Sequence, residues 1–295
     1  MTVSTLSMPA SQTRARHRRR IAWVPTIILF IGALYCLLPL YWLVAASSKL
    51  PGELFTLPSF VPGFSGGIVD NVVALSNYRS GRYWLWTFNS FLYAGGGAAL
   101  STIVSAAAGY GLAKYNFAGK NIVFAFLLGA VLIPGVVLAV PQYLLMSKVG
   151  LAGTYWAVLI PSIVSPLGIY LCRIYAAAVI HDELLEAGRV DGASEVRIFF
   201  SIGLAPMIPG LITVFLLQFV GIWNNFLLPF LMLSDERLFP LTVGLYTMLN
   251  AGTEQPGMYT FIITGAFLSI LPLVALFLLL QRYWRLDLIS GSVKG

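Results

Sequence analysis

Charged residues are scarce in this chain of 295 residues: Asp, Glu, Lys and Arg make up 10%, whereas a soluble domain carries about 25%. Because 58% of the residues are hydrophobic, the composition is typical of a membrane protein. Cysteine is also rare, and Cys36 and Cys172 both lie in apolar runs, so we expect no disulfide framework. The only histidines are His17 and His181, and the sequence shows no cluster of metal ligands. We therefore expect no metal and no cofactor in this chain itself.

The sequence also lacks the motifs with which a transporter obtains energy or an enzyme performs chemistry. A nucleotide-binding P-loop is absent, because the only Gly-Lys pair, Gly119-Lys120, is followed by Asn121 and has no glycine five residues upstream. No apolar segment carries a carboxylate that would relay a proton, or an acid, base or metal ligand for catalysis. We find no internal repeat, so an inverted-repeat secondary transporter has no support. Energy for uphill transport would have to come from another chain.

Six apolar segments are long enough to cross a bilayer as helices, which takes about 20 residues each. They are residues 21–46, 84–113, 122–146, 154–172, 205–233 and 258–281. None contains Asp, Glu, Lys, Arg or His, so all 29 charged side chains, 18 basic and 11 acidic, lie in tails and loops. The first segment is much longer than a secretion-signal core of about 7–15 residues, so we interpret it as a retained span. The prediction is a six-helix, all-α integral membrane domain over residues 21–284.

The distribution of basic residues predicts which side of the membrane each loop occupies. If the arginine cluster of residues 14–20 is cytoplasmic, six crossings place 13 of the 18 Lys and Arg residues inside and five outside. This split follows the positive-inside rule and puts both terminal tails, residues 1–20 and 285–295, in the cytoplasm. The net charge of +7 is therefore an orientation signal, and nucleic-acid binding is disfavoured.

Every predicted span contains proline or a run of glycines, for example Pro134, Pro166 and the stretch AGGGAA at residues 94–99. Such residues kink helices, let them approach closely and free carbonyl groups that can line a cavity. Ordinary bundle packing explains any one of them. Their density across all six spans predicts a bundle that changes shape.

The loop of residues 181–204 is unusually charged and lies on the predicted cytoplasmic side. Asp182 is placed to cap a short helix, Gly192 to end it in the left-handed conformation, and Ser194 to cap a second helix. The apolar face expected on the second helix consists of Val196, Phe199, Phe200 and Gly203. Such a helix pair could lie on lipid, but anionic headgroups would repel the acidic first helix. Docking on a cytoplasmic protein fits better.

The same loop resembles the EAA loop of bacterial ABC importer permeases, whose pattern is E-A-A, three residues, Gly, nine residues and then I-x-L-P. The matching positions are Glu186, Ala187, Gly192, Ile202 and Leu204. The loop departs from the pattern at Gly188, where a second alanine is usual, and at Ala205, where proline is expected. Glycine weakens a helix by about 1 kcal/mol relative to alanine. Part of this loop, RVDGASEVRIFF, resembles the carbohydrate, or maltose-type, branch of these permeases, as do three further stretches: LSNYRSGRYWLWTFNSF, WNNFLLPF and the C-terminal SGSVKG.

This resemblance implies the ABC type I importer permease fold in a bacterial inner membrane, surrounded by lipid. It implies three kinds of protein partner: a second homologous permease, two cytoplasmic ATP-binding subunits and an extracytoplasmic solute-binding protein. ATP and Mg²⁺ would be held by the ATPase partners, so this chain would be non-catalytic. The residues implied in coupling to the ATPase are Glu186, Ala187, Gly188, Arg189, Asp191, Gly192 and Glu195. Alternatively, Glu186 and Arg189 only pair along one helix face.

The implied function is that of a permease for a mono- or oligosaccharide, forming half of the translocation pathway. Because aromatic faces and amides suit sugars, the candidate substrate path comprises Gln218, Trp223, Asn224 and Asn225, with Asn89 and Ser90 as further candidates. These groups could instead hydrogen-bond between helices and hold the bundle together. The alternative functions are a permease for a sugar-like phosphate such as glycerol 3-phosphate, which the lack of basic residues in the spans disfavours, and a stand-alone facilitator or channel. Residues 47–83 are expected to contact the binding protein, and the tail 285–295 the ATPases.

Overall fold

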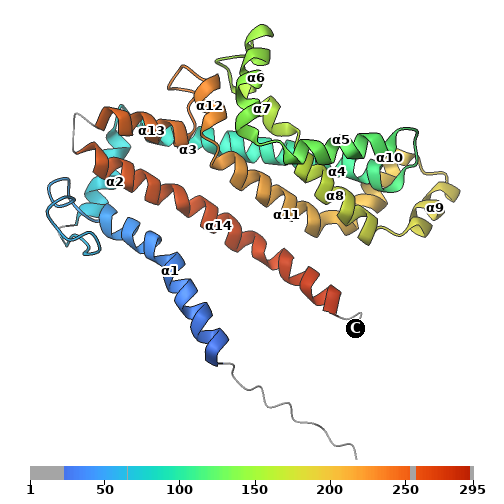
Figure 1. Ribbon diagram of the computed structural model, residues 1–295, viewed down its shortest axis with the longest axis horizontal. Helices are drawn as coiled ribbons and strands as arrows, with labels where there is room; N and C mark the ends of the chain where they lie inside the picture. The colour runs from blue at the N-terminus through green and yellow to red at the C-terminus, as the bar shows by residue number, and fades with distance from the viewer. Residues whose placement is uncertain (1–22, 65, 253–256, 293–295) are drawn as a thin grey trace, which may run out of the picture. The chain divides into compact units, whose positions relative to one another are not determined.

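A computed structural model describes residues 23–64, 66–252 and 257–292, and all of their regular structure is helical (Figure 1). The α-helices are α1 (Trp23–Ser47), α2 (Gly67–Asn77), α3 (Arg82–Phe91), α4 (Gly97–Lys114), α5 (Lys120–Leu132), α6 (Gly135–Lys148), α7 (Tyr155–Ile163), α8 (Pro166–Val179), α9 (Asp182–Val190), α10 (Glu195–Ile198), α11 (Leu204–Trp223), α12 (Leu227–Met232), α13 (Leu241–Gly252) and α14 (Met258–Ser292). Two π-helical turns, η1 (Leu92–Gly96) and η2 (Phe199–Gly203), join α3 to α4 and α10 to α11. The all-α prediction is confirmed for these residues, and the predicted tail 1–20 lies outside them.

The chain divides into two compact units, residues 1–41 and 42–295, which we describe separately. The first unit contains most of α1, whose apolar side chains are exposed on every side of the helix. A helix that is hydrophobic all round suits a lipid environment. The second unit contains the other helices and both of the sites described below.

Among the described residues, five helical stretches are long and apolar enough to cross a membrane, and there are six if one bent pair counts as a span. The five are Trp23–Ser47, Arg82–Lys114, Tyr155–Val179, Glu195–Trp223 and Met258–Tyr283. The bent pair is α5 and α6, which meet at Ile133-Pro134 and differ in direction by 105°. The continuous helix expected over residues 122–146 is therefore two helices, because proline removes a helical donor and its ring collides with the preceding turn.

The fourth span extends beyond its predicted end at residue 172. Its second half, α8, continues to Val179 after a break at Val164-Ser165. Arg173 therefore lies inside a helix rather than in a loop, and its guanidinium carbon is 3.7 Å from the centre of the Phe124 ring on α5. A cation–π contact of this kind offsets part of the cost of keeping a charge near lipid.

The fifth and sixth spans also differ from their predicted lengths. α11 ends at Trp223, and the rest of the predicted fifth span, residues 224–233, is a turn followed by the short helix α12. α14 continues through the predicted end of the sixth span at residue 281 as far as Ser292. Most of the predicted C-terminal tail is thus helical.

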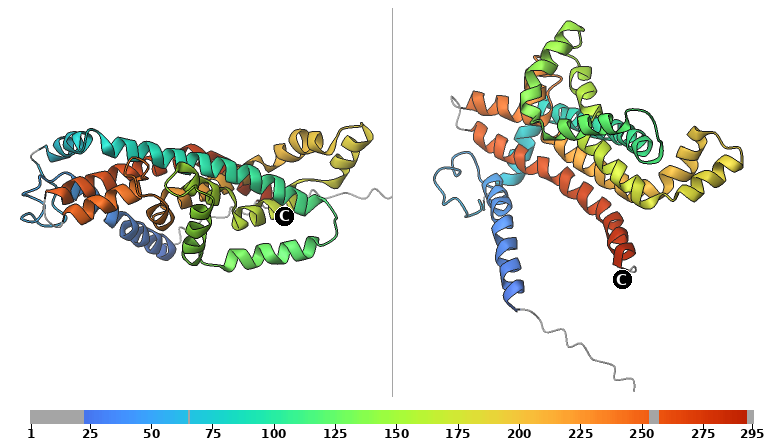
Figure 2. Two further views of the ribbon diagram at one scale, coloured as in Figure 1. Left: turned by 90° about the horizontal axis from the view of Figure 1, so that it is seen from above. Right: turned by 45° about the vertical axis from the view of Figure 1, so that its right-hand side comes forward.

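In the second unit, α4 packs side by side with α8 and α11 (Figure 2). Its buried residues are mostly small, namely Gly97, Ala98, Ser101, Ser105, Ala106 and Gly109, followed by Tyr110 and Leu112. Small side chains let membrane helices approach each other closely, where packing rather than water exclusion holds them together. The sequence run of Ala, Ser and Gly therefore places α4 in the centre of this unit.

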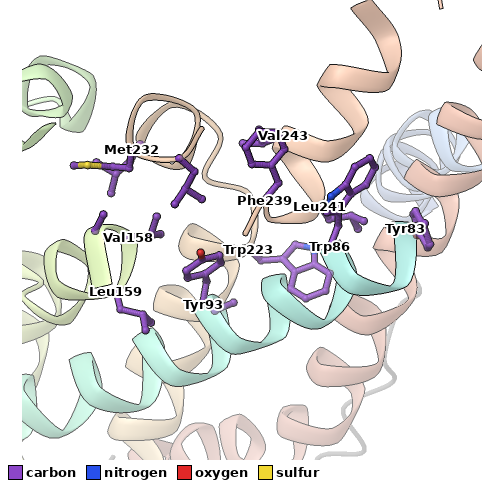
Figure 3. Close-up of a cluster of buried hydrophobic side chains, with 14 of the residues drawn as sticks. Tyr83, Trp86, Tyr93, Val158, Leu159, Trp223, Met232, Phe239, Leu241 and Val243 are labelled. Atoms are coloured by element: carbon purple, nitrogen blue, oxygen red, sulfur yellow. The ribbon is translucent and has the colours of Figure 1, made fainter. Parts of the chain in front are cut away.

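The opposite end of the same span packs with aromatic side chains into a buried cluster. Tyr83, Trp86 and Tyr93 lie there near Phe239 and Leu241, which precede or begin α13 (Figure 3). The Trp86 indole donates a hydrogen bond to the Glu236 carbonyl at 2.8 Å, and the Tyr93 hydroxyl donates one to the Leu238 carbonyl at 3.0 Å. Buried aromatic rings with satisfied polar tips thus hold residues 236–241 in place.

Candidate functional site

Loop 181–204 forms two short helices, α9 and α10. α9 begins at Asp182 with His181 in the capping position and without a side-chain cap, so the predicted capping role of Asp182 is wrong. Asp182 lies instead in the first turn, where a negative charge complements the helix dipole. Ser194 caps α10 as predicted, and its hydroxyl accepts a hydrogen bond from the Arg197 N–H at 3.4 Å.

The turn between the two helices is a Schellman motif. Gly192 has a φ angle of +75°, the left-handed conformation predicted for it. Its N–H donates to the Arg189 carbonyl, and the Ala193 N–H donates to the Gly188 carbonyl, each at 3.0 Å. These bonds satisfy carbonyl groups that the end of a helix leaves without partners. The reversal of the chain here is therefore well defined.

A small apolar interior holds the two helices together. Leu185 of α9 and Ile198 of α10 are both buried there. Gly188 faces the same interior, since a β-carbon on it would lie 2.9 Å from Ile202 Cδ1 and 3.2 Å from Ile198 Cγ1. The position at which the resemblance expects alanine thus allows close approach within the loop, and it does not lie on its outer surface.

Arg189 and Glu195 join the two helices across the turn. Arg189 Nε lies 2.7 Å from Glu195 Oε1, and Arg189 Nη2 donates to Glu195 Oε2 at 3.3 Å. The hydrogen bond to this carboxylate raises the pKa of the Arg189 guanidinium. The alternative pairing of Glu186 with Arg189 is not formed, and Glu186 makes no ion pair or hydrogen bond within the part of the chain that the structure describes.

The outer surface of loop 181–204 carries apolar side chains that the chain itself does not cover. They are Leu184, Val190, Val196 and Phe200, of which Val190 is 88% exposed and Phe200 62% exposed. Glu186 and Ala187 are exposed beside them. The predicted apolar face of the second helix is thus only partly right, because Gly203 faces inward while Val196 and Phe200 face outward. Of these, Val196 and Phe200 are four residues apart and therefore share one face, and exposed apolar side chains that lie together are typical of a contact surface.

The second candidate site is a cavity of about 590 Å³. It lies where three spans are interrupted: at the start of α6, between α7 and α8, and after α11. Its wall includes Gly135, Ser165 and residues 224–228, one group from each interruption. None of the described residues that line it is Asp, Glu, Lys, Arg or His. Non-helical backbone at membrane depth is tolerated where it lines such a cavity.

Three of the predicted substrate-path residues, Gln218, Asn224 and Asn225, line this cavity. Gln218 Nε2 donates a hydrogen bond to Ser165 Oγ. Asn225 Oδ1 accepts the Leu228 N–H at 3.4 Å, while the Asn225 amide nitrogen has no partner among the described residues. The cavity therefore presents amide groups with hydrogen-bonding capacity to spare.

The other predicted substrate-path residues lie elsewhere. Asn89 is fully buried, and its amide nitrogen donates to the carbonyls of Arg237 and Phe239 at 2.8 and 3.0 Å. Ser90 is also buried and accepts a hydrogen bond from a backbone N–H, that of Leu241, at 2.7 Å. Trp223 packs in the buried cluster rather than in the cavity. These contacts favour the alternative role for the three residues, which is to hold the bundle together, and their contact with a substrate stays a prediction.

Three polar residues of the cavity were missed from the sequence, namely Gln142, Ser162 and Ser165. The sequence did contain a signal for Gln142: an amide inside an apolar run is costly unless it has a partner, so such a residue is a candidate for a polar site. Ser165 had another, since serine directly before proline is typical of a helix start, and its hydroxyl does accept the Gly168 N–H at 3.0 Å. Ser162 had none.

Known proteins resemble this chain over most of its length. A family model described as binding-protein-dependent transport system inner membrane component matches residues 99–285. The arabinooligosaccharides transport system permease protein AraQ of Halalkalibacterium halodurans is 37% identical, over 93% of this chain and 97% of its own length. The sn-glycerol-3-phosphate transport system permease protein UgpE of Yersinia enterocolitica is 27% identical, over 94% of this chain and 99% of its own length. A chain in the crystal structure of a bacterial ABC transporter involved in the import of the acidic polysaccharide alginate shares the fold, with a TM-score of 0.76 and 23% identity over 91% of this chain and 98% of that one.

Proposed function

The chain belongs to the family of binding-protein-dependent transport system inner membrane components, and from this membership we propose that it forms half of the transmembrane pathway of an ATP-driven importer for a neutral carbohydrate. As a member it is a non-catalytic, multi-pass permease subunit of an ABC importer in the inner membrane, and it works with an ATPase and a binding protein. In the proposed assembly a second, homologous permease completes the pathway, and two ATPase subunits bind ATP and Mg²⁺. Both termini and loop 181–204 face the cytoplasm, and an extracytoplasmic protein delivers the sugar.

Loop 181–204 is proposed to dock in a groove of the ATPase. When the ATPase subunits close, the loop would move with them and displace the transmembrane spans. One observation carries this proposal: the loop holds its own shape through an apolar interior, a Schellman turn and the Arg189–Glu195 pair, yet leaves apolar side chains exposed. A rigid element transmits a displacement that a flexible one would absorb. In this proposal Glu186, Ala187 and Asp191 contact the ATPase, whereas Gly188, Arg189, Gly192 and Glu195 maintain the shape of the loop.

Reconstitution of the complete transporter in proteoliposomes tests the docking role. With Glu186→Lys we expect sugar uptake and binding-protein-stimulated ATP hydrolysis to fall together, because a reversed charge would meet the ATPase groove. Asn121→Lys, which places the same side chain at an exposed position outside both loop 181–204 and residues 47–83, serves as the control and should retain both activities. Undiminished sugar flux with Glu186→Lys would instead indicate a stand-alone facilitator.

The cavity supports a neutral sugar in preference to a phosphate. Gln142, Gln218 and Asn225 bring amide groups to an uncharged wall, and amides can both donate to and accept from sugar hydroxyls. A phosphate group is normally bound by Arg or Lys, and neither occurs among the described residues that line the cavity. The relative named for arabinooligosaccharides is also more similar to this chain than the relative named for glycerol 3-phosphate.

Competition for uptake tests the substrate class. Proteoliposomes with the full transporter and its binding protein would import a labelled arabino-oligosaccharide, with unlabelled neutral oligosaccharides or glycerol 3-phosphate as competitors. We expect inhibition by a neutral oligosaccharide only. Uptake of glycerol 3-phosphate without uptake of any neutral sugar would replace this proposal with the phosphate alternative.

A further inference from the structure

The second span connects loop 181–204 to the opposite end of the second unit, although the residues concerned are far apart in the sequence. It runs from Arg82 to Lys114 as α3, η1 and α4. Its 33 helical residues extend over about 50 Å. Figure 1 shows α4 ending near α10 and α3 beginning near α2 and α13.

Two neighbouring residues at the end of α4 hold the first residue of each helix in the loop. Lys114 Nζ donates to the Ile180 carbonyl at 2.6 Å and to Asp182 Oδ1, at the start of α9, at 2.7 Å. The Tyr115 hydroxyl donates to Oε2 of Glu195, at the start of α10, at 2.9 Å. The Lys114 side chain is only 8% exposed, whereas the Asp182 side chain is 75% exposed, so burial shields the lysine end of this ion pair and water reaches the carboxylate.

A third contact joins the C-terminal end of loop 181–204 to the second span. The Tyr110 ring lies 5.0 Å from the Phe199 ring, between centroids. A β-carbon on Gly203 would lie 2.9 Å from Tyr110 Cε2. Both Phe199 and Gly203 belong to η2, the π-turn that leads into α11. The loop is thus fixed to α4 at its start, at its middle and at its exit.

The far end of the span holds residues 236–241 just as firmly. Trp86, Asn89 and Tyr93 donate hydrogen bonds to carbonyls of this segment, and Ser90 accepts one from its last N–H. Asn89 is itself oriented by Tyr155, whose hydroxyl donates to Asn89 Oδ1 at 3.0 Å. Because the four groups that bond directly to residues 236–241 all belong to the second span, a shift of that span moves the segment with it.

We propose that the second span is a transmission strut, in which Lys114 and Tyr115 pass displacements of loop 181–204 to residues 236–241 on the other side of the membrane. The proposal rests on the docking role proposed above. The spans that adjoin the loop in the sequence are less suited to this task, because α8 is separated from α7 by the break at Val164-Ser165 and α11 ends at Trp223. The second span is helical throughout. Lys114 and Tyr115 are positioning residues, since they act through the loop.

Replacement of Lys114 tests the strut, with Lys120 as its matched control. Within the part of the chain that the structure describes, Lys120 Nζ donates to the Tyr115 carbonyl and to Asn116 Oδ1, both in the adjacent residues of the chain, and to nothing in loop 181–204. In proteoliposomes we expect Lys114→Met to retain basal ATP hydrolysis, while its stimulation by the sugar-loaded binding protein falls roughly tenfold. More ATP should be used per arabino-oligosaccharide imported. Lys120→Met should behave as wild type, and Lys114→Arg should recover most of the stimulation.

Tyr115→Phe gives a milder variant that removes one hydroxyl and keeps the ring, which lies 5.6 Å from the Tyr110 ring. Tyr143→Phe is its control, because the exposed Tyr143 hydroxyl makes no hydrogen bond within the described residues. We expect a smaller loss of stimulation for Tyr115→Phe, about two- to threefold, and none for Tyr143→Phe. If the Lys114→Met transporter does not assemble, the loss or retention of stimulation in Tyr115→Phe tests the proposal in its place.

The controls separate failure of the strut from failure of the docking role. A wild-type transporter that the loaded binding protein does not stimulate would overturn the proposed function itself. Wild-type stimulation that Glu186→Lys abolishes, but that persists in both Lys114→Met and Tyr115→Phe, would overturn the strut alone. A double variant, Lys114→Met with Asp182→Asn, should lose no more stimulation than Lys114→Met alone. Each of the two substitutions removes the same Lys114–Asp182 ion pair, so their effects should not add.

Discussion

Gly109 of α4 faces Cys172 of α8 so closely that a β-carbon on Gly109 would lie 2.5 Å from the Cys172 Cβ. The same β-carbon would lie 2.7 Å from the backbone nitrogen of Arg173. A backbone atom cannot turn aside as a flexible side chain can, so the two helices would have to separate. This contact therefore sets the distance between two central spans.

Gly109→Ala should destabilise the second unit by about 1–3 kcal/mol, the usual cost of forcing extra volume into a packed core. Gly111→Ala is the matched control on the same helix. Its β-carbon would lie 3.9 Å from Tyr115 Cδ2, an ordinary contact, and alanine is the better helix former by about 1 kcal/mol. Thermal unfolding of the detergent-solubilised permease complex should show a lower Tm for Gly109→Ala and an equal or higher Tm for Gly111→Ala. Equal Tm values would contradict this close contact.

Local chemistry allowed much of loop 181–204 to be predicted from the sequence. Gly192 and Ser194 act within three residues of themselves, so their φ angle and capping bond needed no tertiary information. Apolar length likewise predicted where spans occur, because lipid imposes that requirement on each segment separately. The ends of the spans were less predictable, since a helix can continue past the apolar region when a neighbouring helix supplies a partner, as the Phe124 ring of α5 does for Arg173 of α8.

Interactions between distant segments were not predictable. Arg189 had two acidic neighbours within reach, and the sharp turn, rather than helix spacing, brings Glu195 to it. Asn89 and Gln218 are both amides in apolar runs, yet one is buried against a loop and the other lines a cavity. That difference depends on which side each helix presents to its neighbours. The cavity itself requires three breaks from three spans to meet.

Asn89 provides a test between the structural role that its hydrogen bonds support and its predicted contact with substrate. Asn89→Ala would leave the carbonyls of Arg237 and Phe239 and the Tyr155 hydroxyl without partners, and we expect a loss of about 2–4 kcal/mol of stability. Asn116→Ala, at an exposed position, should leave the Tm unchanged. The apparent KM for sugar should stay at the wild-type value in the folded Asn89→Ala transporter. A raised KM with an unchanged Tm would return Asn89 to the substrate path.

Gly192 can be tested against another left-handed glycine. Gly192 and Gly150 have φ angles of +75° and +73°, and a β-carbon on either would meet no atom within 4 Å. Alanine at either position therefore costs a similar backbone strain, about 1–2 kcal/mol, without a steric clash. We expect similar losses of Tm for both variants, but loss of binding-protein-stimulated ATP hydrolysis for Gly192→Ala alone. Equal activity in the two variants would show that the shape of the turn does not matter for coupling.

The ion pair at the start of α9 has a defined dependence on pH. The hydrogen bond from Lys114 holds the pKa of the Asp182 carboxyl below its usual value. Because the folded pKa is lower than the unfolded value of about 3.9, the stabilising effect is complete above that value and is lost as pH falls through the folded pKa. The difference in Tm between wild type and Asp182→Asn should thus be constant from about pH 8 to pH 5 and shrink below about pH 4. A difference that grew on acidification would contradict the depressed pKa.

Gln218 and Asn225 distinguish a substrate path from a bundle held together by amides. The Gln218 amide already donates to Ser165 on another helix, whereas the Asn225 amide nitrogen has no partner within the described residues. If the cavity binds sugar, Asn225→Ala should raise the apparent KM for uptake about tenfold, the worth of one hydrogen bond, with little change in Tm. Gln218→Ala should raise the KM and also lower the Tm, since it loses an interhelical bond. Gln281→Ala is the control, because that amide bonds to the Leu278 carbonyl of its own helix at 3.0 Å and lies outside the cavity. If only the Tm of Gln218→Ala changes, the amides serve to hold the helices together, and the sugar must contact mainly the partner permease.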